Sequence, residues 1–200
     1  MRKIALTLRV DPIESYNEKR DAVDQKLTDL LYSCGFIPMM VPNNPQYVDL
    51  FLKELKPDGV VLSGGNDLVK YGGKSPERDT VEKALLNFAI EKNLPLLGIC
   101  RGMQFIQDYF GVPLRKIENH VRTHHDLEIN GKVYRANSYH TFGTDASTSD
   151  LKVVARAEDG IVEAIQHKDL PIMGIMWHPE RNSPVSFTDK ELIAKHLTER

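Results

Sequence analysis

Residues 94–104 read Leu94-Pro95-Leu96-Leu97-Gly98-Ile99-Cys100-Arg101-Gly102-Met103-Gln104. An apolar strand ends in this stretch and a helix is predicted to begin, with Cys100 at the turn between them. Glycines two residues before and two after the cysteine allow a sharp turn that holds a nucleophile clear of the sheet. The thiol then lies near a helix N-terminus, where the helix dipole favours the thiolate. The backbone N–H of Arg101 is also free to face an oxyanion, so we predict that Cys100 is a catalytic nucleophile.

Outward from this turn, apolar strand-like segments alternate with segments that have the periodicity of amphipathic helices. The predicted strands are 4–8, 37–41, 59–62 and 94–99, and the predicted helices are 18–34, 47–55, 79–93 and 104–110. Short strands follow at 127–129, 132–137, 153–156, 163–166 and 172–176, with a hairpin turn at Asn130-Gly131 and a closing helix at 188–198. This order predicts a flavodoxin-like, open and mostly parallel α/β sheet with helices on both faces and an antiparallel extension. A single domain is expected over residues 1–200, with its site at the carboxyl ends of the strands.

The composition is that of an ordinary globular protein. Hydrophobic residues make up 41% of the 200 residues, and the net charge is -2 with a pI near 6.4. These values give no reason to expect binding to nucleic acid or to a membrane, and no apolar run reaches the length of a membrane span. Only two cysteines occur, Cys34 and Cys100, so we expect no disulfide framework and a cytoplasmic location. Cys34 lies among apolar residues of a predicted helix and is interpreted as structural.

A cysteine nucleophile needs a base and a group that orients the base. The sequence Met176-Trp177-His178-Pro179-Glu180 follows the apolar strand 172–176. Residues two apart in extended backbone point the same way, so we expect His178 and Glu180 to lie side by side. Because both segments follow strands of the same predicted sheet, Cys100, His178 and Glu180 are predicted to form a catalytic triad.

These two segments resemble the class I glutamine amidotransferase superfamily, and more closely its γ-glutamyl hydrolase branch. Further matching pieces are Ser63-Gly64-Gly65-Asn66-Asp67, Arg78-Asp79 with Glu82, and Asn137-Ser138-Tyr139-His140. The resemblance implies a Cys-His-Glu triad that acts through a γ-glutamyl thioester, with neither metal nor organic cofactor. It implies an oxyanion hole from the backbone of Gly65, or of Gly64, and of Arg101. It also implies that the following residues bind the glutamyl group: Gly64, Gln104, Asn137, Ser138, Tyr139 and His140.

The leaving group is less constrained by the sequence. Basic residues crowd two predicted active-site loops, and they favour an anionic nucleotide leaving group over the alternative, γ-aminobutyrate. These residues are Lys70, Lys74 and Arg78 in one loop, and Arg115, Lys116, His120, Arg122, His124 and His125 in the other. The spacing of the histidines matches no common structural zinc site, so no metal is expected.

Two interpretations of the wider assembly remain open. The charged Arg101 and the absence of an attached synthetase favour a free-standing hydrolase. The alternative is a glutaminase subunit that delivers ammonia to a separate synthetase. A homodimer is compatible with the sequence. The Arg101 side chain has a second interpretation, as an ion-pair partner of Glu82 or Glu77.

Overall fold

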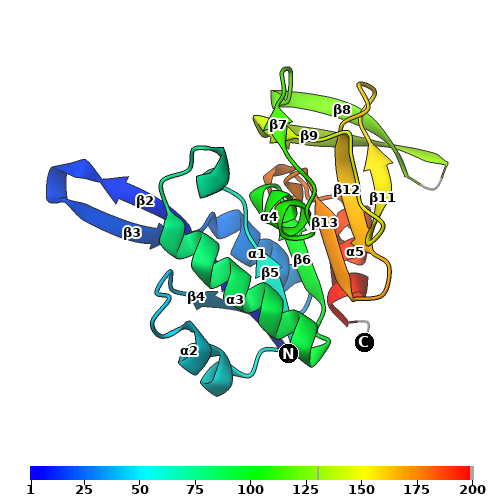
Figure 1. Ribbon diagram of the computed structural model, residues 1–200. Helices are drawn as coiled ribbons and strands as arrows, with labels where there is room; N and C mark the ends of the chain where they lie inside the picture. The colour runs from blue at the N-terminus through cyan, green and yellow to red at the C-terminus, as the bar shows by residue number, and fades with distance from the viewer. Residues whose placement is uncertain (130, 199–200) are drawn as a thin grey trace.

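The computed structural model describes residues 1–129 and 131–198. Its centre is a seven-stranded sheet in the order β11-β12-β13-β6-β5-β1-β4 (Figure 1). The parallel strands are β1 (Arg2–Thr7), β4 (Phe36–Val41), β5 (Gly59–Leu62), β6 (Leu96–Ile99) and β13 (Ile172–Ile175). The antiparallel strands β11 (Leu151–Arg156) and β12 (Val162–His167) extend one edge. The predicted mostly parallel sheet with an antiparallel extension is therefore confirmed.

Helices cover both faces of the sheet, and each face has its own apolar core. One face packs against α2 (Val48–Leu55), α3 (Pro76–Lys92) and α4 (Arg101–Tyr109). The other packs against α1 (Gln25–Ser33) and α5 (Phe187–Thr198). The short buried strands alternate between these cores, because successive side chains of a strand point to opposite faces. Strands β5 and β6 are buried at every position, as expected for the middle of a parallel sheet. No helix within the described ranges is long and apolar enough to cross a membrane.

Within residues 1–129 and 131–198, three two-stranded ribbons lie outside the central sheet. Strands β8 (Val121–Ile129) and β9 (Lys132–Tyr139) form a long hairpin, and β7 (Arg115–Lys116) pairs with β10 (Phe142–Gly143). The turn predicted at Asn130-Gly131 joins β8 to β9, but Asn130 lies outside the described residues. The third ribbon, β2 (Arg9–Ile13) with β3 (Glu18–Ala22), projects from the body of the molecule (Figure 1).

This projecting ribbon corrects the prediction of a helix over 18–34. Helix α1 begins only after Asp24, whose side chain accepts a hydrogen bond from the Lys26 N–H at 3.0 Å and caps the helix. The segment from Glu18 to Asp21 is exposed and has no apolar residue. It therefore has no face to bury as a helix, and it pairs with β2 instead.

The segment after β13 also differs from the prediction. Pro179–Arg181 is a 3-10 turn and not extended backbone. Proline restricts the residue that precedes it, whereas its own fixed φ suits the first position of a helical turn. His178 remains non-helical, with φ -111° and ψ 89°, and the turn begins immediately after it.

Candidate active site

Cys100 occupies a strained turn between β6 and α4. Its φ of 51° and ψ of -106° lie in a region that non-glycine residues rarely adopt. A Cβ on Gly98 would lie 2.6 Å from the Gly102 backbone, and one on Gly102 would lie 2.1 Å from the Leu62 carbonyl oxygen. Glycine at both positions therefore allows the helix to approach the sheet closely enough to form the turn. This geometry is that of a nucleophile elbow.

His178 and Glu180 lie beside this thiol at the end of β13. His178 Nδ1 is 2.7 Å from Glu180 Oε1, and both side chains are buried. The His178 side chain also hydrogen-bonds the Cys100 thiol. Both residues lie beside Gly64, because a Cβ built there would be 2.8 Å from His178 Cε1 and 3.6 Å from Cys100 Cβ. The structure therefore brings together the three residues that the sequence predicted as a triad.

The thiol and the imidazole perturb each other's protonation. Burial raises the pKa of Cys100, but His178, His140 and the backbone N–H of Arg101 together lower it below its ordinary value. Burial lowers the pKa of His178, but Cys100 and Glu180 outweigh this effect and raise it to about 9. Both shifts favour a thiolate paired with an imidazolium at neutral pH.

The Asn137 side chain bonds to the backbone of His178. Its Oδ1 accepts a hydrogen bond from the His178 N–H at 2.8 Å, and its Nδ2 donates to the His178 carbonyl at 2.8 Å and to Asn182 Oδ1 at 2.9 Å. The amide is buried, and its hydrogen bonds fix the backbone of His178. Ser138 likewise donates its hydroxyl to the His120 carbonyl at 2.8 Å. Both side chains thus bond to the protein, and the role of these two residues in binding the glutamyl group stays a prediction.

A cavity of about 290 Å³ opens over the thiol. Among the predicted ligand-binding residues, Gln104, Tyr139 and His140 line it. Gln104 donates from Nε2 to the Phe142 carbonyl at 2.9 Å, and Tyr139 packs edge-on against the His178 ring at 5.8 Å between centroids. The complete lining is Gly65, Asn66, Asp67, Cys100, Arg101, Gln104, Tyr139, His140, Thr141, His178 and Arg181.

A second cavity of about 310 Å³ adjoins the first and shares Gly65, His178 and Arg181 with it. Gly64 and the base of the β2–β3 ribbon form its wall, so a ribbon that the sequence analysis missed contributes to the site. Arg181 also lines both cavities, although no sequence motif predicted it. It follows Glu180 directly and stacks over the Tyr139 ring at 4.4 Å from its centroid. Its position immediately after the predicted triad carboxylate was the one signal available.

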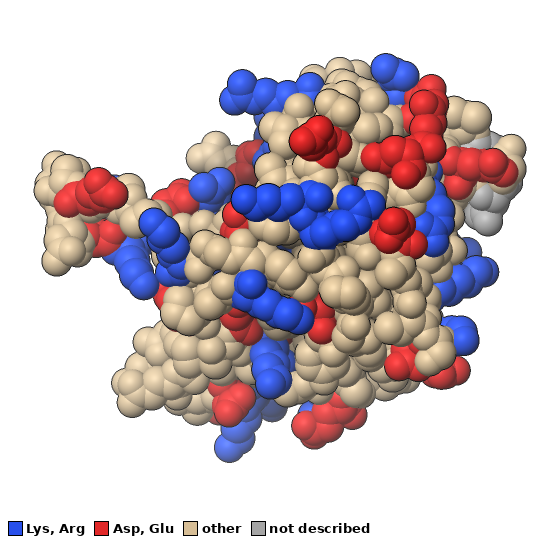
Figure 2. All heavy atoms as spheres, turned by 45° about the horizontal axis from the view of Figure 1, so that its top comes forward, with Lys and Arg blue, Asp and Glu red and all other residues tan. Residues whose placement is uncertain are grey.

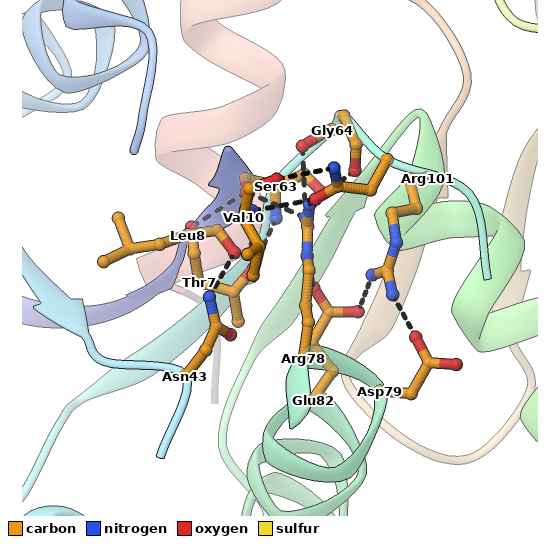
Figure 3. Close-up of polar contacts among 12 residues, drawn as sticks. Thr7, Leu8, Val10, Asn43, Ser63, Gly64, Arg78, Asp79, Glu82 and Arg101 are labelled. Atoms are coloured by element: carbon orange, nitrogen blue, oxygen red, sulfur yellow. Dashed lines mark hydrogen bonds and ion pairs between the residues drawn. The ribbon is translucent and has the colours of Figure 1, made fainter. Parts of the chain in front are cut away.

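The loop after β5 is held from behind by Arg78. This guanidinium is completely buried and donates to the carbonyls of Ser63 at 2.7 Å and Gly64 at 3.1 Å, and also to that of Gly65 (Figure 3). In a trans peptide the carbonyl and the N–H point in opposite directions. The N–H groups of Gly64, Gly65 and Asn66 therefore point away from Arg78. Gly65 and Asn66 also line the cavity over Cys100.

The Arg101 side chain is an ion-pair partner, as one of the two interpretations predicted. It pairs with Glu82 and with Asp79, and its own exposed fraction is 1% (Figure 3). Glu77, the other predicted partner, instead pairs with Lys19 at 2.8 Å. The backbone N–H of Arg101 stays at the start of α4 beside the thiol, so the two roles of this residue do not compete.

The predicted basic loops do not surround the site. Arg78 and His120 are buried, while Lys70 pairs with Asp108 at 2.6 Å and Arg115 with Asp145 at 3.2 Å. As far as the structure describes the chain, none of the nine predicted basic residues lines either cavity. Figure 2 shows Lys and Arg interspersed with Asp and Glu on the face that it presents, and not gathered into one patch. Sequence proximity to a loop was a poor guide because it does not determine where a long side chain points.

Three buried side chains near the site could ligate a metal ion. His120 Nδ1 and His140 Nε2 each lie 3.3 Å from Glu163 Oε1. Asp159 contacts the other nitrogen of His120 at 2.9 Å, and the Phe142 carbonyl contacts that of His140 at 2.9 Å. Burial lowers the pKa of His120, but Glu163 and Asp159 outweigh this effect and raise it above its ordinary value.

Comparison with known proteins identifies the family of this chain. The family model described as glutamine amidotransferase class-I matches residues 17–198. The chain belongs to this family. A γ-glutamyl-CDP-amidate hydrolase from Campylobacter jejuni is 36% identical over 187 residues, which cover 90% of each chain. A γ-glutamyl-γ-aminobutyrate hydrolase from Escherichia coli O157:H7 is 28% identical to this chain, over 80% of this chain and 79% of the relative.

A solved structure supports the fold of this family. A protein from Thermoplasma acidophilum, described as a GMP synthase subunit, aligns with a TM-score of 0.73 and 21% identity, over 98% of this chain and 92% of that chain. At this identity the likeness concerns the architecture alone, and it agrees with the predicted class I amidotransferase fold.

Proposed function

We propose that this protein is a cysteine-dependent hydrolase of γ-glutamyl amides, with Cys100, His178 and Glu180 as its catalytic triad. The observation that carries the proposal is the elbow thiol beside an imidazole that a buried carboxylate orients at 2.7 Å. The perturbed pKa values of Cys100 and His178 support it, because they favour the reactive ion pair.

In the proposed mechanism, the Cys100 thiolate attacks the γ-carbonyl carbon and the carbonyl electron pair moves onto oxygen. The N–H groups of Gly65 and Arg101 stabilise this oxyanion. As the intermediate collapses, the C–N bond breaks and the His178 imidazolium transfers its proton to the departing nitrogen. A γ-glutamyl thioester remains on Cys100.

Water completes the reaction. The now neutral imidazole of His178 removes a proton from water, and the hydroxide attacks the thioester through a second oxyanion. Collapse releases L-glutamate and restores the thiolate and the imidazolium. Glu180 stabilises the charged ring in both half-reactions and fixes its tautomer, so that Nε2 faces the reacting atoms.

For the substrate we propose a γ-glutamyl amide of a cytidine nucleotide, γ-glutamyl-CDP-amidate, which would release cytidine diphosphoramidate for modification of capsule polysaccharide. This choice rests on the relative that is 36% identical over 90% of each chain. The basic loops give it no support, since they do not face the cavities. The second candidate is γ-glutamyl-γ-aminobutyrate, which the relative with 28% identity favours. Gln104, Tyr139 and His140 line the cavity over the thiol and are proposed to hold the glutamyl group.

The test is L-glutamate release from glutamine, γ-glutamyl-γ-aminobutyrate and γ-glutamyl-CDP-amidate, with Cys100→Ala as the blank. We expect the highest kcat/KM for the nucleotide and no release by Cys100→Ala. A preference for γ-glutamyl-γ-aminobutyrate would keep the chemistry and replace the substrate. Full activity of Cys100→Ala would refute the mechanism.

A further inference from the structure

The two proposed oxyanion donors come from different parts of the chain. Gly65 belongs to the loop after β5, and Arg101 begins α4, which follows β6. An oxyanion hole works only if its donors keep a fixed separation, because the gain comes from dipoles that need no reorganisation during the reaction. A loop with two consecutive glycines has little rigidity of its own. Something else must therefore hold the loop in register with the helix.

Four side chains connect these two segments, and we call them the arginine brace: Arg78, Asp79, Glu82 and Arg101. Glu82, completely buried on α3, accepts a hydrogen bond from Arg78 Nε at 2.9 Å and also pairs with Arg101 Nη1 (Figure 3). Arg101 Nη2 pairs with Asp79, one helical turn before Glu82. The Glu82 carboxylate thus connects two arginines. Arg78 holds the glycine loop, and the backbone of Arg101 supplies the other oxyanion donor.

The brace is balanced in charge and well bonded. Two guanidinium groups face two carboxylates, so the buried charges compensate each other. Burial lowers the pKa of Arg78 to about 10, which leaves it charged at neutral pH. Burial raises the pKa of Glu82, but Arg101 and Arg78 outweigh this effect and keep it below its ordinary value. Arg78 uses the planar fork of its guanidinium to reach Glu82 and three successive carbonyls at once, which a lysine cannot do.

We propose that the arginine brace sets the separation and orientation of the two oxyanion donors, so that Arg78, Glu82 and the Arg101 side chain are positioning residues for the reaction. This inference rests on the proposed function. It differs from a purely structural role in one respect. A structural network would affect the stability of the fold, whereas a brace for the oxyanion hole affects the steps in which an oxyanion forms.

The experiment compares Arg78→Lys and Arg101→Lys with the wild type. Both variants keep the positive charge and lose the forked contacts, and Arg101→Lys also keeps the backbone N–H. We expect kcat for glutamate release to fall by between about 10- and 100-fold, with KM changed less than threefold, as for a misplaced catalytic group. Alkylation of Cys100 by iodoacetamide forms no oxyanion, so its rate should stay within about twofold of the wild type at temperatures where each variant is folded.

Two further measurements make the result specific. The γ-semialdehyde analogue of glutamate adds to the thiol to give a tetrahedral oxyanion, so its affinity should fall by the same factor as kcat. Glu77→Gln is the matched control, because Glu77 precedes Arg78 on α3 but pairs with Lys19 at the surface. It should leave kcat unchanged.

The possible outcomes are separable. An active wild type whose Arg78→Lys and Arg101→Lys variants keep full kcat would refute the brace and leave the proposed function intact. A fall in alkylation rate that matches the fall in kcat would also refute it, since the damage would then lie in the nucleophile. A wild type that hydrolyses none of the three amides would overturn the proposed function, and this inference with it.

Discussion

Replacement of Gly64 by alanine tests how closely the backbone of Gly64 approaches the imidazole of His178. Gly64 does not have a left-handed φ, so alanine introduces no backbone strain there. Its Cβ would nevertheless lie 2.8 Å from His178 Cε1. Carbon atoms in contact are normally at least about 3.5 Å apart, so the imidazole would have to move by about 0.7 Å.

The ring has little freedom to move by that amount. Glu180 holds its Nδ1 at 2.7 Å, and Asn137 bonds both the N–H and the carbonyl of the same residue at 2.8 Å. A displacement of about 1 Å at a catalytic group costs about 100-fold in rate. We therefore expect Gly64→Ala to lower kcat/KM by between about 10- and 100-fold, while the alkylation of Cys100 also slows because its ion-pair partner has shifted.

The assay is glutamate release together with urea unfolding of the same sample. The free energy of unfolding should fall by about 1–3 kcal/mol, because the added methyl group crowds the imidazole, but the protein should remain folded. Leu50→Ala is the control for a neutral substitution, since Leu50 is 57% exposed on α2. A folded Gly64→Ala protein with the kcat/KM of the wild type would refute the close approach of Gly64 to the imidazole.

Thiol reactivity, the protonation of His178 and the packing of the core can each be tested separately. At pH 7 iodoacetamide should label Cys100 far faster than Cys34, since the pKa of Cys100 is lowered whereas burial raises that of Cys34. Peptide mass spectrometry measures both labelling rates, and equal rates would contradict this prediction. Glu180→Gln should lower the pKa of His178 from about 9, because a charge-assisted hydrogen bond worth about 1.5–3 kcal/mol is lost. A less stable imidazolium stabilises the thiolate less, so the pH at which alkylation of Cys100 reaches half its maximum should move to a higher value. An unchanged pH profile would contradict the contact between Glu180 and His178. Leu86→Ala, at a completely buried position of α3, should lower the free energy of unfolding by about 2–5 kcal/mol in urea, and a loss below about 1 kcal/mol would count against this core.

The sequence was sufficient for the architecture of the sheet and for choosing three residues, Cys100, His178 and Glu180, that lie together in the structure. Strand β5 was predicted at its observed bounds, because a run of apolar residues that ends in Ser63-Gly64-Gly65 has few alternatives in an α/β chain. Cys100 could be singled out because the glycines that its turn needs are neighbours in sequence. His178 and Glu180 could be paired because they are two residues apart. Local spacing carries this information, since the backbone geometry of a turn is determined within a few residues.

Tertiary structure alone decided what the side chains contact. The ribbon from Arg9 to Ala22 has no apolar periodicity, so its strands depend on pairing with each other. Asn137 was assigned to the ligand, yet its amide is occupied by His178, which lies 41 residues further along the chain. Arg78 looked like a surface cation of a basic loop, yet it is the buried anchor of the glycine loop. A long polar side chain that becomes buried needs hydrogen-bond partners, and those partners determine where it points. They come from distant parts of the sequence and lie within reach only when the chain has folded.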